Sequence, residues 1–204
     1  LNLSGFDKFD NTVKADSTWE IFPALGSIDA QGLLHPEKAG KGKISATITQ
    51  MRTGKQIEVS TDIAVTAGET TKIVVAPNPV QVVAGEEVMF EAISYDPFGN
   101  TTDADLNWQI EPSELGNLAP DGRFSAVRAA SGEVLVRFGN VVGSAEIKIV
   151  PAAAAFLKII PEEITLEAGQ QLRVEAIIED KFGNVVTGNV LWSLSNPSLA
   201  AIDA

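Results

Sequence analysis

The chain has 204 residues, is 45% hydrophobic, and carries 15 basic and 27 acidic side chains for a net charge of −12. This acidity argues against binding to nucleic acid or to an anionic lipid surface, because their phosphate groups would be repelled. The absence of cysteine excludes disulfide bonds, thiolate catalysis and thiolate metal ligands. The chain has no run of about 18 apolar residues, so the sequence predicts no segment that spans a membrane.

One motif, Asp-x-Phe-x-Asn followed by a lone tryptophan, occurs three times. Its copies begin at Asp7, Asp96 and Asp180, and the tryptophans that follow them are Trp19, Trp108 and Trp192. The aspartates and the tryptophans are both spaced by 89 and then 84 residues. A period of this length is too long for a solenoid unit and fits one small β-sandwich domain.

We therefore predict an all-β fold of tandem immunoglobulin-like Greek-key β-sandwich domains arranged as a rod. The expected repeats are residues 1–68, which lack the opening strands, residues 69–152, which are complete, and residues 153–204, which lack the closing strands. The links between them are short, which favours limited bending. The chain begins without an initiator methionine or a signal peptide, which suggests a piece of a longer polypeptide.

In the first repeat, alternating Ile44, Ala46 and Ile48 predict a strand, and a last strand is expected near residues 57–65. His35 is the chain's one histidine and lies between Leu34 and Pro36 in a turn-rich stretch. It has no equivalent in the other repeats, so we interpret it as a surface residue rather than a zinc ligand or a member of a catalytic triad.

In the second repeat, two β-branched runs, 72–76 and 80–83, are separated by Pro77-Asn78-Pro79. A proline pair at that point is typical of an edge strand that breaks and changes sheet. Alternating residues then predict strands near 88–93, 105–110, 133–138 and 145–149, with Trp108 on the core face of the second of these. The third repeat reproduces this pattern 84 residues later, with strands expected at 172–179 and around Trp192.

The motif itself favours a structural turn. Gly99 and Gly183 supply positive φ, and Asp10 at the same place in the first copy tolerates that conformation better than most residues. The aromatic residues Phe9, Phe98 and Phe182 occupy equivalent positions, and we expect Phe98 and Phe182 to tuck into the end of the core. The three tryptophans are interpreted as core residues, the alternative being exposed platforms for stacking sugars.

A calcium site is the alternative interpretation of the motif. Its candidate ligands are Asp96, Asn100, Asp103 and Asp105. Calcium usually takes six or more oxygen ligands, and one Asp with one Asn supplies too few without the two additional aspartates. Apart from this calcium alternative, we expect no cofactor.

No catalytic constellation is present, so the sequence predicts that the chain is not an enzyme. There is no Gly-x-Ser-x-Gly nucleophile motif. Adjacent carboxylates such as Glu86-Glu87 and Glu162-Glu163 would point to opposite faces of a strand and could not act as one acid–base pair.

The stretch Ala-Gly-x-x-Val-x-Phe-x-Ala, the Asp-x-Phe-Gly-Asn turn and the tryptophan together resemble the bacterial immunoglobulin-like (Big) repeats of invasin/intimin-type adhesins, S-layer proteins and other cell-surface proteins. The alternating strands that begin at Gly42 and Gly132 match a late strand of that family. The resemblance implies an extracellular location, at a bacterial cell surface or secreted. It transfers no catalytic residue.

The leading hypothesis is a non-catalytic structural or interaction segment of a bacterial surface protein, with self-association or with other surface proteins and glycans as partners. The alternatives are a carbohydrate- or cell-wall-binding module and an accessory region of a secreted hydrolase. A further hypothesis is donor-strand addition, in which the tail of one chain completes the head of the next. The simpler alternative is a fragment boundary.

Overall fold

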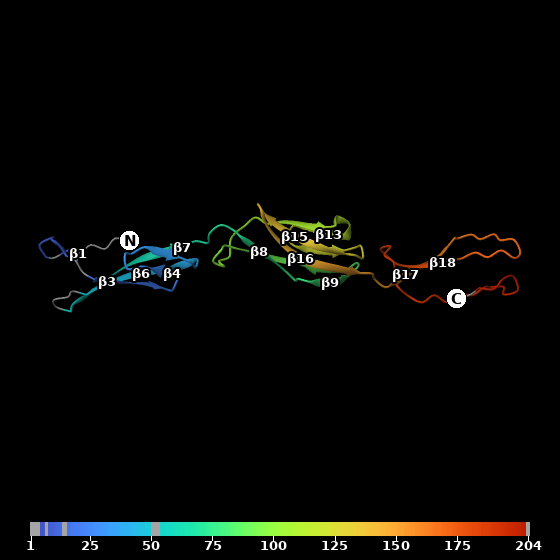
Figure 1. Cartoon of the computed structure of the whole chain (residues 1–204), viewed down its shortest axis with the longest axis horizontal. Helices are drawn as coiled ribbons and strands as arrows, with labels where there is room; N and C mark the ends of the chain where they lie inside the picture. Colours follow the sequence, from blue (N-terminus) through green and yellow to red (C-terminus); the bar gives the residue numbers. More distant parts are fainter. Residues whose placement is uncertain (1–4, 7, 14–15, 50–53, 203–204) are drawn as a thin grey trace. The chain divides into compact units, whose positions relative to one another are not determined.

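The computed structural model describes residues 5–6, 8–13, 16–49 and 54–202. Within these residues the chain is all β, with 18 strands and one short 3-10 turn, η1 (Ser113–Leu115) (Figure 1). The predicted fold class of immunoglobulin-like β-sandwich repeats is confirmed. Contacts divide the chain into two compact units, residues 1–73 with 93–105, and residues 74–92 with 106–204. No helix among the described residues is long and apolar enough to cross a membrane.

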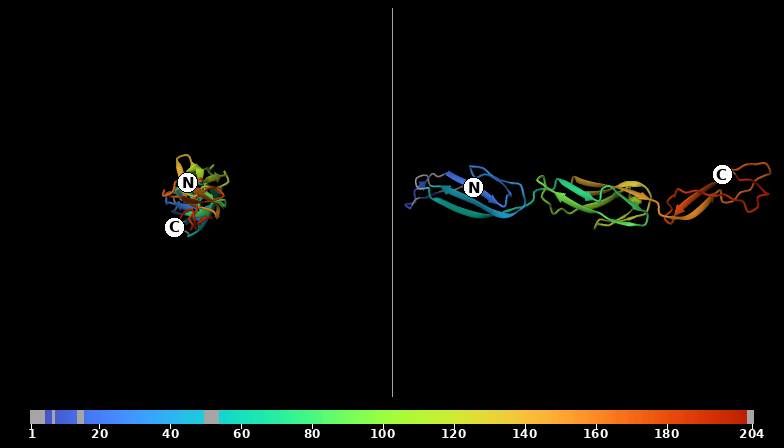
Figure 2. Two further views of the ribbon diagram at one scale, coloured as in Figure 1. Left: turned by 90° about the vertical axis from the view of Figure 1, so that its right-hand side faces the viewer. Right: turned by 90° about the horizontal axis from the view of Figure 1, so that it is seen from below.

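The second repeat forms a sandwich of two sheets, which can be followed from two sides in Figures 1 and 2. One sheet has the order β10 (Glu87–Met89), β14 (Arg123–Ala126), β13 (Gly116–Leu118). The other has the order β12 (Asn107–Glu111), β15 (Ser131–Phe138), β16 (Val141–Val150), β9 (Val80–Val83). This arrangement corresponds to the two sheets of an immunoglobulin domain.

The chain changes sheet at Pro77-Asn78-Pro79, as the sequence predicts. Before this point β8 (Lys72–Ala76) pairs with β11 (Glu91–Tyr95), and after it β9 runs parallel to β16, with Val80 opposite Ile147. The Asn78 side chain fixes the crossing, since it donates to the Ser144 carbonyl at 3.1 Å and accepts from the Glu146 amide at 3.0 Å.

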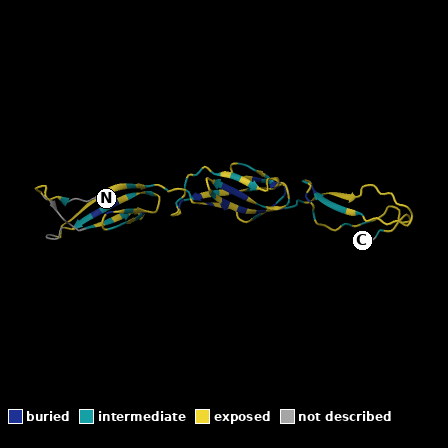
Figure 3. Cartoon of the chain, turned by 45° about the horizontal axis from the view of Figure 1, so that its top comes forward, coloured by how far each residue is buried: buried dark blue, intermediate teal, exposed yellow. Residues whose placement is uncertain are grey.

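The core of this sandwich is closed by alternating inward side chains. The fully buried residues include Phe90, Phe124, Leu115, Val134 and Val136. Along β16 every second residue is buried, which matches the predicted period of two and gives the dark-blue strands in Figure 3.

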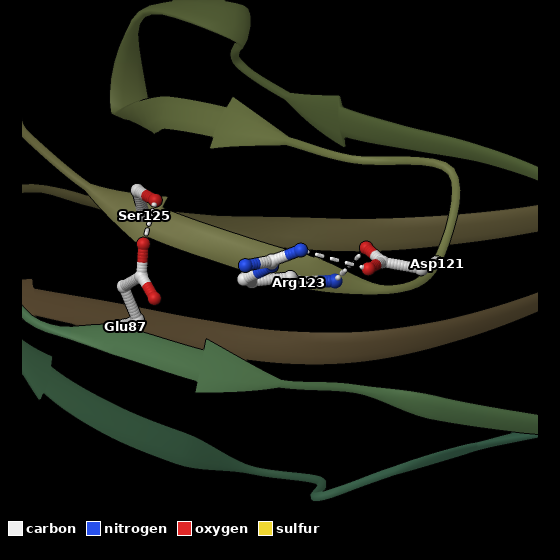
Figure 4. A network of polar contacts seen from close by, with 4 residues as sticks. All are labelled: Glu87, Asp121, Arg123 and Ser125. Carbon is white, nitrogen blue, oxygen red and sulfur yellow. Dashed lines mark hydrogen bonds and ion pairs between the residues drawn. The ribbon is translucent and has the colours of Figure 1, made fainter.

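The outer face of the first sheet is polar. The Ser125 hydroxyl donates to Glu87 at 2.8 Å across β10 and β14, and Arg123 pairs with Asp121 at 3.1 Å in the adjoining turn (Figure 4). The amide and guanidinium of Arg123 lower the pKa of Asp121. These groups are exposed, so solvent screens them and they define the face rather than stabilise the fold.

In the first repeat, β3 (Asp16–Phe22), β6 (Gly40–Thr49) and β7 (Gln56–Val65) form one sheet in that order. A second small sheet pairs β4 (Gly26–Ile28) with β5 (Leu34–Pro36), and β1 (Gly5–Phe6) pairs with β2 (Thr12–Val13) around the first turn. Strands β3 to β7 correspond to the later part of the second repeat, from β12 to β16. His35 lies on β5 and is exposed, as predicted.

In the third repeat, β17 (Ala154–Ile160) pairs with β18 (Glu175–Asp180). The strand predicted at 172–179 begins at residue 175 instead. The prediction of a strand around Trp192 is wrong, because residues 186–194 form none. In the second repeat β10 and β12 bond to β14 and β15. No described strand of the third repeat supplies such partners, so its alternating apolar residues around Trp192 do not form a hydrogen-bonded strand.

The middle core should carry most of the stability of its repeat. Phe124 is fully buried, and Phe124→Ala should lower the free energy of unfolding by about 3–5 kcal/mol through lost transfer energy and a cavity. Phe138→Ala is the control, because Phe138 is 39% exposed. Urea unfolding followed by tryptophan fluorescence measures both. Equal losses in the two variants would contradict this account of the core.

Candidate functional site

The Asp-x-Phe-Gly-Asn turn of the second repeat is closed by its own aspartate. One carboxylate oxygen of Asp96 accepts the amides of Phe98 and Asn100, each at 2.9 Å. The backbone amide of Asp96 donates to the Asn100 carbonyl at 3.0 Å. The turn needs a positive φ at its fourth residue, which Gly99 supplies at 83°.

The same aspartate and asparagine also reach outside the turn. The second oxygen of Asp96 accepts the amide of Gly68, in the link, at 2.9 Å and the side-chain amide of Asn100 at 2.8 Å. Asn100 then binds the backbone of the first repeat: its Oδ1 accepts the Ala39 amide at 2.8 Å, and its Nδ2 donates to the Glu37 carbonyl at 2.7 Å. The turn therefore binds both the link and the preceding repeat, and all of these contacts lie within one compact unit.

Every one of these side-chain contacts recurs at the next turn. Around Asp180, with distances of 2.8–2.9 Å, the corresponding groups are Phe182, Asn184, Ala152 of the link, and Ala129 and Val127 of the second repeat. We name each such set an Asp–Asn joint. Each joint lies within a single compact unit, and residues 93–105 group with the first repeat for this reason.

The first copy of the turn keeps the backbone conformation. Asp10 has φ 63°, against 81° at Gly183, which confirms that the aspartate adopts the left-handed region. Asp7, which would close this turn, lies outside the described residues. Phe9 is 72% exposed with Lys8 Nζ 4.7 Å from the centre of its ring.

The carboxylates of the two later joints are buried and remain ionised. Asp96 is 4% and Asp180 0% exposed. Burial on its own would raise the pKa of each, but the hydrogen bonds from the asparagine side chain and from three backbone amides outweigh it and lower the pKa of both to about 2. Each carboxylate is thus stabilised by four N–H donors and no cation.

The turn phenylalanines do not behave as predicted. Phe98 is 62% exposed, so the expectation that it tucks into the end of the core is wrong. Phe182 is half-buried, but against the preceding repeat: a methyl group at Gly85 would overlap its ring. The described part of the first repeat has no counterpart of the Ala84-Gly85 turn to receive Phe98.

The tryptophans lie at the margin of the cores. All three are half-buried, and Trp192 lies outside any strand. The ring edge of Trp108 packs beside Gly122, where an added Cβ would be 3.2 Å from Cη2. Phenylalanines rather than tryptophans fill the centre of the middle sandwich.

The geometry does not fit a calcium site at Asp96. Both of its oxygens already accept two N–H groups each, whereas a calcium ligand must offer free lone pairs. Asp103 and Asp105 are exposed. In the described parts of the chain, no group of three or more Asp, Glu or His side chains is placed to hold a metal ion. Calcium binding elsewhere stays an untested expectation.

Comparison with known proteins gives similarity in structure only. No family model matches the chain, and no curated protein matches it. Similar solved structures include the S-layer protein SbsC (TM-score 0.40, 16% identity, 90% of this chain, 26% of that one) and Yersinia pseudotuberculosis InvD (0.46, 14%, 90%, 65%). Drosophila N-cadherin is a third (0.44, 9%, 68%, 42%). At such low identities and TM-scores, the likeness carries no information about partners or activity.

Removing the asparagine of a joint should loosen the contact with the preceding repeat. Asn184→Ala leaves the Ala129 amide and the Val127 carbonyl without their partner, at a cost of about 1–3 kcal/mol. Hydrogen exchange at the Ala129 amide should accelerate. Asn107→Ala, on an exposed strand position, is the control. Unchanged protection of Ala129 in the Asn184 variant would show that the joint is not formed in solution.

The joints should weaken in acid. Because the pKa of Asp180 is about 2 in the folded chain and ordinarily 3.8, its contribution is complete above about pH 4 and is lost as the pH falls towards 2. Urea-unfolding midpoints measured down to about pH 2 should fall through this window, and Asp180→Asn should flatten that fall. Asp103→Asn, at an exposed site, should keep the wild-type profile. A wild-type midpoint that is constant from pH 4 to pH 2 would refute the assignment.

Proposed function

We propose that the chain is a non-catalytic spacer segment of a bacterial cell-surface protein, such as an S-layer protein, an adhesin stalk or a surface filament. In it, immunoglobulin-like repeats follow one another along the chain and are connected by Asp–Asn joints. The observation that supports this most directly is the repeated Asp–Asn joint, in which Asn100 and Asn184 bind the backbone of the preceding repeat in the same way.

A short link alone would leave two sandwiches free to rotate, since interfaces between domains of one chain are commonly small and mobile. Each joint adds two hydrogen bonds between the asparagine and the preceding repeat, and one between the link amide and the aspartate. These three contacts restrict the motion of the turn and of the link against the preceding repeat. A spacer needs this property if it is to hold a distance.

The chemistry of the joint also suits an extracellular position. All partners of Asp96 and Asn100 outside the turn are uncharged backbone groups of residues 37, 39 and 68. Salt screens interactions between exposed charges, but it has little effect on hydrogen bonds to neutral groups. The extracellular, bacterial assignment itself rests on the resemblance of the repeated motif to the Big family.

Buried polarity is concentrated in the joints. Among the described residues, the buried polar side chains are Ser94, Asp96, Asp180 and Asn184. Three of them belong to joints, and the fourth, Ser94, donates to the Thr102 carbonyl at 2.9 Å. This distribution supports a role in which polar groups maintain architecture.

A carbohydrate-binding role receives less support. A surface groove of the second repeat is lined by Pro79, Gln81, Ser131, Glu133, Glu146 and Lys148 among others. None of its lining residues is aromatic. Sugar binding commonly depends on stacking against an exposed aromatic ring, so this groove does not favour it.

The spacer role is tested by the spread of distances across a joint. Because the chain has no cysteine, spin labels attach only to the two cysteines introduced by Glu111→Cys and Glu175→Cys. Both positions are exposed, and they lie on either side of the second joint. Pulsed electron resonance should give a narrow distance distribution that calcium and EDTA do not change. Asn184→Ala should broaden it, whereas the Asn107→Ala control should not. A wild-type distribution as broad as that of the Asn184 variant would refute the proposal.

A further inference from the structure

The two joints differ at the residue that follows the aspartate. In the first joint this residue is Pro97, and in the second it is Lys181. Both are exposed, and in the described part of the chain no hydrogen bond of either turn involves them. Asp96–Pro97 is the one Asp–Pro bond in the sequence. The joints therefore share their hydrogen bonds but differ in the peptide bond that follows the buried carboxylate.

An Asp–Pro bond combines a nucleophile with a good leaving group. The side-chain carboxyl can attack the carbonyl carbon of its own residue and form a five-membered cyclic anhydride, and carboxylates act as nucleophiles in this way in enzymes. Because both groups belong to one residue, the attack is intramolecular and needs no encounter. The proline nitrogen belongs to a tertiary amide and leaves as a secondary amine, which is more basic than the primary amine that another residue would leave.

The closed joint withholds the carboxylate from this reaction. One oxygen of Asp96 accepts the amides of Phe98 and Asn100, each at 2.9 Å. The other accepts the Gly68 amide at 2.9 Å and the Asn100 side chain at 2.8 Å. Lone pairs that accept N–H groups are not free to attack a carbonyl carbon. Asp96 is also only 4% exposed, which limits the access of water.

We propose that the Asp96–Pro97 bond is a latent self-scission site, which the closed first joint blocks and which opening of that joint in acid makes reactive. Scission there divides the chain into residues 1–96 and 97–204. The inference is independent of the spacer role, because it concerns the chemistry of one peptide bond and not what the repeats do.

The reaction needs no reactant except water. A carboxyl oxygen of Asp96 bonds to the Asp96 carbonyl carbon, the bond from that carbon to the Pro97 nitrogen breaks, and the carboxyl proton passes to the leaving nitrogen. One water then opens the cyclic anhydride, which restores the Asp96 side chain and gives a terminal carboxyl group. The net change is hydrolysis of one peptide bond, and nothing is oxidised or reduced.

Acid both opens the joint and supplies the proton. Burial raises the pKa of Asp96, but the hydrogen bonds from the Asn100 side chain and from three backbone amides outweigh it and lower the pKa to about 2. In an opened joint these bonds are absent, so the pKa returns towards 3.8. Between these values the closed joint holds the carboxyl ionised, whereas the opened joint holds mainly the protonated form. The stability contributed by this group is therefore lost as the pH falls from about 4 towards 2.

Other ionisable groups near the first joint are accessible to solvent. They belong to the preceding repeat, the link, β8 and the strand and loop on either side of the turn: Glu37, Lys38, Glu69, Lys72, Tyr95, Asp103 and Asp105. All are exposed except Tyr95, which is half-buried. Among the described residues none of them forms an ion pair with Asp96. Solvent screens their charges, so the N–H donors remain the cause of the low pKa of Asp96.

The second joint is a control that the chain itself supplies. Asp180 is held by the same kinds of donor, and its pKa is also lowered to about 2, so this joint opens in the same acid range. The residue that would leave there is Lys181, whose nitrogen becomes a primary amine. We therefore expect the second joint to open without scission.

Exchanging the two residues tests the site. Pro97→Lys gives the first joint the residue of the second, and Lys181→Pro does the reverse without removing a hydrogen bond of the turn. After incubation at about pH 2, intact mass spectrometry should find fragments 1–96 and 97–204 from the wild-type chain. Pro97→Lys should yield several-fold less of them, and Lys181→Pro should add a break after Asp180. Absence of the wild-type fragments, or the same yield from Pro97→Lys, would overturn the proposal.

A second measurement tests whether the joint blocks the site. At about pH 3 the folded wild-type chain should be cleaved several-fold more slowly than the same chain unfolded in urea. Asn100→Ala removes a donor to Asp96 and both contacts with the preceding repeat, so it should accelerate cleavage several-fold in buffer and have no effect in urea. Asn184→Ala, the same change in the second joint, is the matched control and should keep the wild-type rate.

Two results would contradict this role of the joint. Equal cleavage rates of the wild-type chain with and without urea would show that the fold does not protect the bond. Equal acceleration by Asn100→Ala and Asn184→Ala would show that a general loss of stability, and not opening of the first joint, exposes it. Tryptophan fluorescence of both variants at the same pH establishes that they are folded during the measurement.

Discussion

The structure depends on two buried aspartates, Asp96 and Asp180, each of which accepts four N–H groups at the start of a tight turn. Desolvating a carboxylate is costly, and only a complete set of donors makes it tolerable. In this chain the donors come from the turn itself, from the following asparagine and from the link to the preceding repeat. The interaction that forms the turn is therefore the same one that fixes the link.

The asparagine extends this arrangement. Asn184 donates one amide hydrogen to Asp180, which orients its side chain, and its remaining donor and acceptor then meet the backbone of the preceding repeat. Because the partners are main-chain groups, the contact sets few demands on the side chains of residues 127 and 129. In the first repeat Glu37 takes the place of Val127, Ala39 corresponds to Ala129, and the same backbone contacts form.

The three repeats also differ in how completely their cores are buried. The second repeat buries its core because strands from before and after its turn face each other, with Phe90 and Val136 almost fully enclosed. The first repeat buries Leu25, Ile44 and Ala46, whereas the described part of the third repeat buries no apolar side chain. Where a strand has no neighbour, as around Trp192, alternation in the sequence does not produce a strand, because a ladder requires backbone partners.

The sequence by itself determined the repeat period, the all-β class, the change of sheet at Pro77–Pro79 and the left-handed residue of each turn. All of these depend on local rules: alternation, the fixed φ of proline, and the freedom of glycine. It also identified Asp96 and Asn100 as polar residues of a structural turn, with calcium ligation as the alternative. Only the tertiary structure decided that the pair binds the Gly68 amide and the backbone of residues 37 and 39, and that Phe98 is exposed. Backbone amides and carbonyls are the same at every position, so no residue type marks the ones that a distant side chain will reach.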